Sequence, residues 1–349
     1  MYTRPLTAKD TVGDRTQPTE GSPIPGLSLL DLVWRRRPRG SGRATVGCAI
    51  HLAKGRAMHI LRYRRPGSAR ELVGVLDGDR VSELDVSSLA ALWSLRVDAL
   101  RERLVERRRG GPLLEEVELL APIDGRTEVW ACGVTYEISR EARVEESERS
   151  ANVYEQVYEA DRPELFFKSS AWRVVGEGGS VAIRSDSTLD VPEPEVALVV
   201  NAFGEIVGYT VCDDVSSRSI EGENPLYLPQ AKIYLGGCAL GPMVRPAWEV
   251  ADPYSLRIRL SIHRSGAMAW SGTASTAQLH RRYEDLVSYL TRADVHPDGV
   301  VLSTGTCLVP PAPFTLEAGD TVRIEIEEIG TLTTSVVRGL DAAVAAGSR

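Results

Sequence analysis

The sequence predicts an α+β protein that is mainly β, and three observations support this fold class. Alternating apolar and polar residues, which are typical of half-buried strands, dominate the C-terminal part, as at 255–266 and 318–337. Apolar residues at helical spacing are confined to a few stretches, chiefly 87–107 and 280–290. No internal repeat or heptad period is visible. Many strands with few helices therefore predict packed sheets.

The composition excludes several classes of protein. The 349 residues carry a formal net charge of −7 and are 43% hydrophobic, enough for a sizeable core and more than one domain. No apolar run approaches the ~20 residues that span a bilayer, and the N-terminus lacks a signal peptide's apolar segment, so we expect a cytoplasmic protein. The acidity disfavours nucleic acid as a partner. Five scattered cysteines without a CxxC pair favour reduced thiols.

The N-terminal third divides into an extension and a small domain. Residues 1–57 are rich in Pro, Gly, Ser, Thr and Arg, so we expect a mostly disordered extension, and Met58 is an alternative start. Residues 58–118 are expected to form a small β-rich domain, with a hairpin around Asp77-Gly78 and a helix over 87–107. A second domain would cover 119–349.

Residues 128–190 are expected to combine strands with surface helices. EVWACGV at 128–134 reads as a strand, and the charged segment 135–160 as one or two amphipathic helices. RPELFFKSS at 162–170 predicts a core strand, and 174–187 two short strands around glycines.

Residues 191–214, VPEPEVALVVNAFGEIVGYTVCDD, predict a β-hairpin that carries three acids. Prolines disfavour a helix, and two apolar runs flank a turn at 201–204. Residues two apart on a strand share a face, so the Glu193 and Glu195 carboxylates lie side by side. If paired residue numbers sum to about 405, Asp214 lies opposite Val191 and diagonal to Glu193.

Three carboxylates at this separation repel one another unless a cation lies between them. An all-oxygen set of donors suits Mg²⁺ or Mn²⁺ better than Zn²⁺. The alternative is an edge hairpin that acids and prolines keep soluble. From the hairpin alone, the second interpretation is favoured, and only the residues that follow change this.

The chain after the hairpin is expected to begin with a polar loop that wraps over a site. Residues 216–230 are polar and punctuated by prolines, and Lys232 then precedes glycines such as Gly241, where backbone can approach a ligand. Further strands are expected at 255–266, 300–306 and, as a pair, within 318–337.

Six motifs in one order carry a family resemblance: ELFFK, VPEPEVALVV, GEIVGYTVCDDVSSR, LPQAK, CALGP and STGT. With them the chain resembles the fumarylacetoacetate hydrolase family over about residues 119–340. The resemblance implies a β-roll for the second domain and Mg²⁺, with Mn²⁺ as an alternative, bound by Glu193, Glu195 and Asp214. It also implies a homo-oligomer, a dimer or larger, that acts on a small keto acid.

Two further stretches, IEGENPLYLPQAK and GVTYEISREARVEES, are most similar to the branch that contains 2-keto-3-deoxy-D-arabinonate dehydratase. Ser139 and Ala142 stand where hydrolases and decarboxylases of the family carry a His and a Glu, which favours elimination over hydrolysis. The resemblance therefore implies Mg²⁺-dependent dehydration of a 2-keto-3-deoxy sugar acid. The alternatives are an acylpyruvate or diketo-acid hydrolase or decarboxylase, and a non-catalytic relative.

The same resemblance assigns roles to single residues. Lys232 and Glu164 are implied as the proton-transferring pair. Four residues are implied as substrate-binding: Arg218, Thr306, Lys168 and Gly241. The chain departs from the branch at Asp213, where Asn is usual, and at Ser219, where Asp is usual. These departures bear on substrate preference more than on the metal site.

Overall fold

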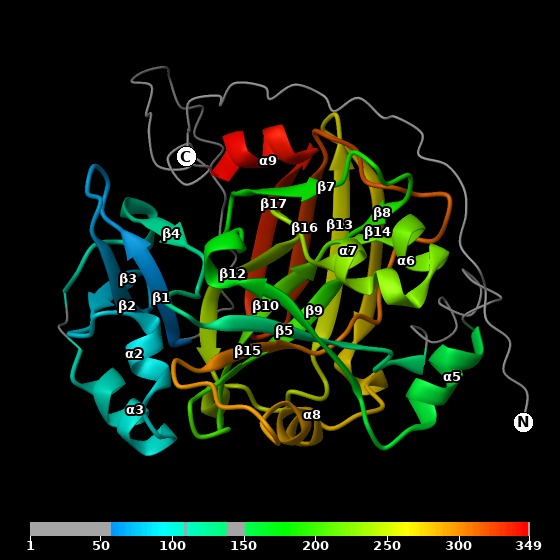
Figure 1. Ribbon diagram of the computed structural model, residues 1–349. Helices are drawn as coiled ribbons and strands as arrows, with labels where there is room; N and C mark the ends of the chain where they lie inside the picture. The colour runs from blue at the N-terminus through cyan, green and yellow to red at the C-terminus, as the bar shows by residue number, and fades with distance from the viewer. Residues whose placement is uncertain (1–56, 108–109, 138–150, 348–349) are drawn as a thin grey trace, which may run out of the picture. The chain divides into compact units, whose positions relative to one another are not determined.

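The computed structural model describes residues 57–107, 110–137 and 151–347. These residues form a ten-stranded sheet, a five-stranded sheet and a two-stranded pair, joined by short helices (Figure 1). The predicted α+β, mainly β class is confirmed. Within the described residues, no helix is long and apolar enough to cross a membrane. The expected extension lies outside the described residues, apart from residue 57.

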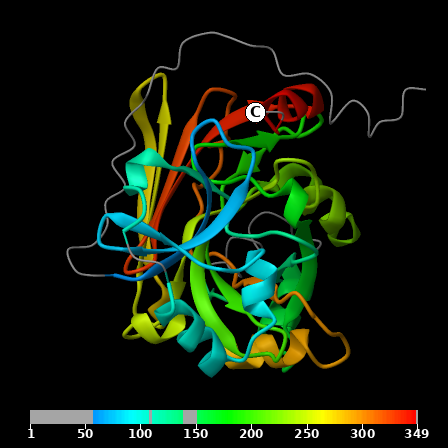
Figure 2. The same ribbon diagram turned by 90° about the vertical axis from the view of Figure 1, so that its left-hand side faces the viewer.

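The larger sheet joins the N-terminal strands to the hairpin strands. β1 pairs with β12, Ile60 facing Val244, so the N-terminal strands share one sheet with the strands of the hairpin. Figure 2 shows β1 to β3 with their helices, in blue and cyan, facing the viewer. In sheet order the strands are β3 (Arg80–Glu83), β2 (Glu71–Asp77), β1 (His59–Arg64), β12 (Cys238–Pro246), β10 (Ile206–Asp214), β9 (Pro194–Val200), β15 (Val300–Ser303), β5 (Glu128–Gly133) and β6 (Glu164–Ser170), with β4 (Glu118–Leu120) paired to β1.

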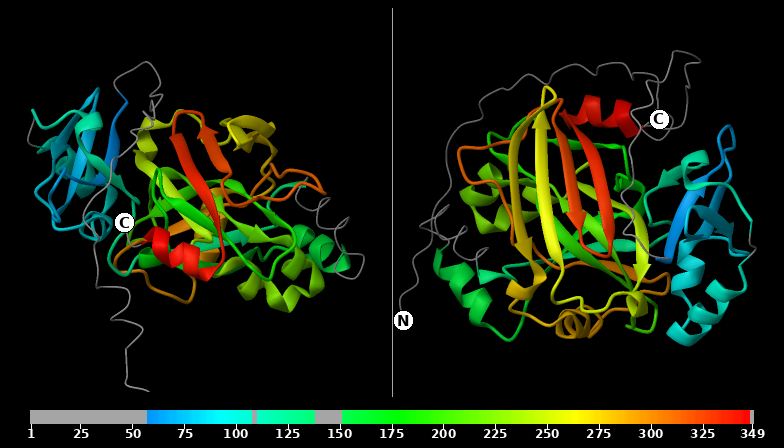
Figure 3. Two further views of the ribbon diagram at one scale, coloured as in Figure 1. Left: turned by 90° about the horizontal axis from the view of Figure 1, so that it is seen from above. Right: turned by 180° about the vertical axis from the view of Figure 1, so that it is seen from behind.

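The second sheet packs against the first and is seen from behind in the right panel of Figure 3. Its order is β14 (Ala267–Ser275), β13 (Arg257–Arg264), β16 (Thr321–Ile326), β17 (Gly330–Arg338) and β7 (Ser180–Ile183), and β8 (Asp190–Val191) pairs with β11 (Ser216–Ser217). The helices are α2 (Leu89–Trp93), α3 (Val97–Val105), α5 (Ala151–Glu159), α6 (Arg218–Glu223), α7 (Leu228–Lys232), α8 (Tyr283–Leu290) and α9 (Leu340–Gly347).

Strand β9 is apolar on both faces because both faces are covered. Leu198 belongs to the core cluster that also holds Leu260 of β13, between the two sheets. Val199 points the other way, into the cluster that holds Leu100 of α3. A strand enclosed in this way needs an uninterrupted apolar run, which its sequence supplies. The hairpin is thus anchored at the centre of the fold.

The helix predicted over 87–107 is two helices. α2 begins after Ser88, whose hydroxyl accepts a hydrogen bond from the Ala91 N–H, and α3 starts anew at Val97. The Val97 N–H donates to the Glu205 carboxylate at 2.9 Å, so the turn of the hairpin caps α3. Apolar spacing did not reveal the break because it comes from this distant contact.

Two other expectations need correction. The stretch 174–187 contains one strand, β7, and Val175 makes only an isolated bridge to Ala239. The loop expected over 216–230 is largely helical, with α6 and α7 separated by a single turn at Pro225–Tyr227. Its polar, proline-punctuated sequence did not reveal helices this short.

Candidate metal centre and active site

The three acids of the hairpin come together, by a register that differs from the expected one. A bulge between Ile206 and Gly208 shifts the pairing of β9 and β10. Asp214 therefore lies opposite Glu193, and its N–H donates to the Glu193 carbonyl at 3.0 Å. Val191, the partner expected for Asp214, pairs with Ser216 instead.

The side chains of Glu193, Glu195 and Asp214 fit a hard cation. All three are buried, and one carboxylate oxygen from each lies within 4.8 Å of the others. Burial, with the neighbouring Asp214 and Glu193 carboxylates, raises the pKa of Glu195 to about 8. An all-carboxylate cluster whose charges destabilise one another is the donor set that Mg²⁺ or Mn²⁺ takes in proteins.

Two lysines bring positive charge to this cluster. The Lys232 ammonium donates to Glu193 at 2.8 Å, to Asp214 at 3.2 Å and to the Ser216 hydroxyl at 2.6 Å. Lys168 is fully buried, pairs with Asp214 and donates to the carbonyls of Val215 and Lys232. Buried charges persist only when they are paired in this way.

Glu195 is held from the opposite side by the end of β15. The Ser303 hydroxyl and the Gly305 N–H both donate to the same carboxylate oxygen, at 2.6 and 2.8 Å. Gly305 has a φ of 88°, and a Cβ there would lie 2.1 Å from the Thr135 hydroxyl. The glycine of STGT is therefore required for this backbone to approach Glu195.

A narrow cleft, with a cavity volume of about 20 Å³, lies over the carboxylates. Two of the acids that line it, Glu164 of β6 and Glu221 of α6, are not part of the cluster. Gly133 makes room for the first, since a Cβ at Gly133 would lie 1.9 Å from Oε2 of Glu164. Thirteen residues line the cleft: Cys132, Gly133, Val134, Glu164, Phe166, Glu193, Glu195, Arg218, Glu221, Leu228, Lys232, Gly305 and Thr306.

Arg218 and Thr306 face the cleft while contacting its walls. Arg218 pairs with Glu193 at 2.9 Å and approaches Glu221 at 3.8 Å. The Thr306 hydroxyl donates to the Pro194 carbonyl at 3.0 Å. Both are thus fixed against the strand that carries the acids, an arrangement that suits binding of an anionic ligand.

The other two residues implied as substrate-binding lie elsewhere. Lys168 contacts Asp214 but is not among the residues that line the cleft. Gly241 lies within β12, where a Cβ would first meet Leu332, and it does not line the cleft. Ser139 and Ala142 fall outside the described residues.

Two acids near the cluster were not assigned from the sequence. Glu221 is buried at the cleft, one helical turn after Arg218, and this spacing was the available signal. Asp213 is also buried, and its Oδ1 accepts the N–H of Glu193 at 3.2 Å. Burial raises the pKa of Asp213 to about 8. Asp213 therefore holds the backbone of a cluster residue.

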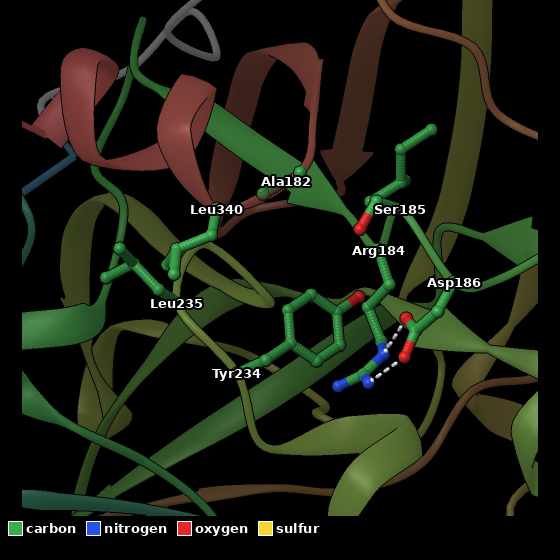
Figure 4. A pocket seen from close by; sticks show the side chains of 9 residues that line it. Ala182, Arg184, Ser185, Asp186, Tyr234, Leu235 and Leu340 are labelled. Atoms are coloured by element: carbon green, nitrogen blue, oxygen red, sulfur yellow. Dashed lines mark hydrogen bonds and ion pairs between the residues drawn. The ribbon is translucent and has the colours of Figure 1, made fainter. Parts of the chain in front are cut away.

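A second hollow, with a cavity volume of about 300 Å³, lies beside Tyr234 and Leu340 (Figure 4). Arg184 and Asp186 at its rim form a two-pronged pair with distances of 2.8 and 2.6 Å, so each charge is already neutralised. The hydroxyl of Tyr234 donates to the Val215 carbonyl. This hollow lacks the convergent acids and cations of the cleft.

Comparison with known proteins gives a consistent picture. Residues 129–337 match the family model described as fumarylacetoacetate (FAA) hydrolase C-terminal. The chain is 46% identical over 256 residues to a probable 2-keto-3-deoxyxylonate dehydratase of Haloferax volcanii, covering 73% of this chain and 84% of the relative. It is 42% identical over 273 residues to the 2-dehydro-3-deoxy-D-arabinonate dehydratase of Saccharolobus solfataricus, covering 75% and 91%.

Solved structures agree with these sequence matches. A 2-keto-3-deoxy-D-arabinonate dehydratase complexed with magnesium and 2,5-dioxopentanoate superposes with a TM-score of 0.69 and 37% identity, covering 80% of this chain and 98% of that one. Its apo form superposes with a TM-score of 0.71. The protein therefore belongs to the fumarylacetoacetate hydrolase C-terminal family, as the sequence motifs predicted.

Proposed function

We propose that this protein is a Mg²⁺-dependent hydro-lyase that dehydrates a 2-keto-3-deoxy sugar acid of the pentonate type. The observation that carries the proposal is the convergence of Glu193, Glu195 and Asp214 beneath a cleft that also presents Lys232 and Glu164. The dehydratase names of relatives at 42–46% identity support the same reaction class.

The three carboxylates would hold the ion, and the substrate would lie above them in the cleft. Bound Mg²⁺ supplies positive charge that polarises the 2-keto group and makes the C3 protons more acidic. Lys232 must then give up its contacts with Glu193 and Asp214 and retain its contact with Ser216.

Dehydration requires one group that takes a proton and another that gives one. The C3–H bond breaks as its proton passes to a base, and the C4–O bond breaks as the hydroxyl gains a proton and leaves as water. Lys232 and Glu164 are the proposed pair. Both line the cleft and neither belongs to the carboxylate cluster.

The substrate carboxylate would be recognised by fixed donors. Arg218 carries a guanidinium at the cleft wall beside Glu193, and Thr306 presents a hydroxyl beside Pro194, the first residue of β9. Lys168 would act through Asp214, which it contacts directly. Gly241 would serve as a backbone position in β12 behind the site.

The remaining expectations stay part of this proposal. We propose a cytoplasmic homo-oligomer with a small N-terminal domain at 58–118 and a metal-binding catalytic domain at 119–349. The acidic net charge of −7 and the absence of an apolar run of spanning length support the location. Neither nucleic acid nor membrane is a partner in this proposal.

The proposal is tested by offering the purified protein two substrate classes with Mg²⁺. We expect 2-keto-3-deoxypentonates to yield 2,5-dioxopentanoate, and this product to disappear when EDTA removes the metal. Acylpyruvates, which a hydrolase of the same family would cleave to pyruvate, serve as the comparison. Turnover of acylpyruvates alone would refute dehydration.

A further inference from the structure

Arg281 precedes α8 in the chain, and its guanidinium binds the C-terminal end of α5, at the lower right in Figure 1. Its Nη2 group donates to the carbonyls of Val157 and Ala160 at 2.8 and 2.7 Å, and its Nη1 group donates to the carbonyl of Asp161 at 3.2 Å. The last carbonyls of a helix have no partner within the helix, so a cation that binds them stabilises the helix end. Arg281 thus fixes the end of α5 and the first residues after it.

The segment that carries Arg281 is itself fastened to the chain after β5. The His280 N–H donates to the Thr135 carbonyl, two residues after the end of β5, at 2.9 Å. The His280 ring also stacks on Tyr158 of α5, with ring centroids 4.3 Å apart. Arg281 therefore links α5 to the end of β5, where Gly133 lines the cleft.

Residues 160–163 form a connector that leads from α5 to Glu164, the first residue of β6. Glu164 lines the cleft and pairs with Gly133, and this pair is the last one at that end of the ladder between β5 and β6. The last pair of a ladder is held by fewer neighbours than an internal pair, so its geometry depends on the chain that leads to it. The position of the Glu164 side chain is therefore set partly by the connector.

Arg281 differs from the arginines around it in what its guanidinium contacts. Arg281 is half-buried, and its hydrogen bonds go to main-chain carbonyls. Arg282 is exposed and pairs with Glu284 at 3.5 Å, and Arg292 is exposed and lies 3.6 Å from the centre of the Tyr289 ring. A guanidinium presents several N–H groups in one plane, which suits binding of several carbonyls at once.

We propose that Arg281 is a positioning residue for the dehydration: by holding the end of α5 and the connector, it keeps the Glu164 carboxyl where it transfers a proton. This inference rests on the proposed function, which makes Glu164 one of the two proton-transferring residues. Arg281 is not among the residues that line the cleft, so it acts through Glu164 and not by contact with the substrate. Its loss should lower kcat and leave KM and Mg²⁺ affinity unchanged.

The first test is a double-mutant cycle on the full-length protein with Mg²⁺ and a 2-keto-3-deoxypentonate. Arg281→Met should lower kcat about 10- to 100-fold at unchanged KM, because a proton-transferring group displaced by about 1 Å loses rate without loss of substrate binding. In the Glu164→Gln background the same substitution should have no further effect, since the group that it positions is gone. Arg292→Met removes an exposed guanidinium at the other end of α8 and should leave kcat at the wild-type value.

The second test is hydrogen exchange measured by mass spectrometry, which reports on position without using activity. In Arg281→Met the amides of residues 157–166 should exchange faster than in wild type, while those of β13 keep the wild-type rate. Should Arg281→Met not fold, Arg281→Lys replaces it in both tests, because a single ammonium cannot bind all three carbonyls in the same way.

The outcomes separate this inference from the proposed function. Unchanged kcat in Arg281→Met, an equal fall in kcat with and without Glu164, or wild-type exchange over residues 157–166 overturns the inference alone. Full activity of Glu164→Gln overturns the proton-transferring role of Glu164 in the proposed function, and the inference falls with it.

Discussion

The hairpin β9–β10 and the segment α6–α7 both contribute residues to the cleft and are built differently. In the hairpin, β9 is paired on one side with β10 and on the other with β15, and every residue of β9 is buried. The segment consists of helices of six and five residues, and its middle exposes Leu226 by 83% and Tyr227 by 40%. Helices so short depend on tertiary contacts.

The hairpin and the segment therefore have different roles in the proposed site. The hairpin supplies negative charge in a fixed geometry, while the segment supplies Arg218 and Lys232, which pair with that charge. Substitutions in the hairpin should therefore abolish metal binding. Substitutions in the segment should impair turnover or substrate binding and spare the metal.

The largest effect is expected for Glu195→Gln in the hairpin. The change removes a metal donor that Ser303 and Gly305 hold in place, so Mg²⁺ affinity should fall and turnover should drop at least about 100-fold. Isothermal titration with Mg²⁺ and steady-state kinetics measure both. Glu115→Gln, at an exposed position, is the matched control. Full activity that is independent of metal would refute the metal assignment.

The second effect is expected for Lys232→Met in the segment. Loss of a proton-transferring group should lower kcat by about 10²- to 10⁴-fold. Mg²⁺ affinity should stay equal or rise, because an ammonium that contacts Glu193 and Asp214 no longer competes for them. Titration calorimetry on the same preparation separates the two outcomes. If metal binding is lost together with turnover, the division between hairpin and segment is wrong.

The sequence was sufficient for the hairpin because strand alternation is a local property. Period-two spacing placed Glu193 and Glu195 on one face, and the structure brings them together with Asp214. The predicted register was wrong by two residues. One comes from the turn, since Ile206 already pairs with Val200, and the other from the bulge between Ile206 and Gly208, which the apolar pattern does not reveal.

The structure of the α6–α7 segment could not be predicted from local sequence patterns. Six residues of α6 are too few to show a helical period, so Glu221 went unassigned although it lies at the cleft. The need for glycine at 305 depends on Thr135, about half the chain away, and appears only in three dimensions. The site is therefore completed by contacts between residues far apart in the chain, which sequence patterns do not reveal.

The third prediction concerns pH and returns to the hairpin. Without metal the Glu195 carboxyl, with a pKa of about 8, is protonated at pH 7, whereas a metal donor must be ionised. Mg²⁺ binding should therefore release a proton, and affinity should rise up to about tenfold per pH unit until pH passes about 8. Calorimetry in buffers of different ionisation enthalpy measures the released proton. Equal affinity at pH 6 and pH 8 would contradict this.

The smallest effect is expected for Glu221→Gln in the segment. Glu221 approaches Arg218 at 3.8 Å and lines the cleft, so its charge helps to orient the guanidinium that would bind the substrate. Glutamine keeps the size and loses the charge, and KM should rise about tenfold, equivalent to about 1.4 kcal/mol, with little change in kcat. Mg²⁺ affinity should stay at the wild-type value because Glu221 is not one of the three cluster acids. A fall in Mg²⁺ affinity as large as that of Glu195→Gln would show that α6 belongs to the metal site, and the hairpin and the segment would then share one role.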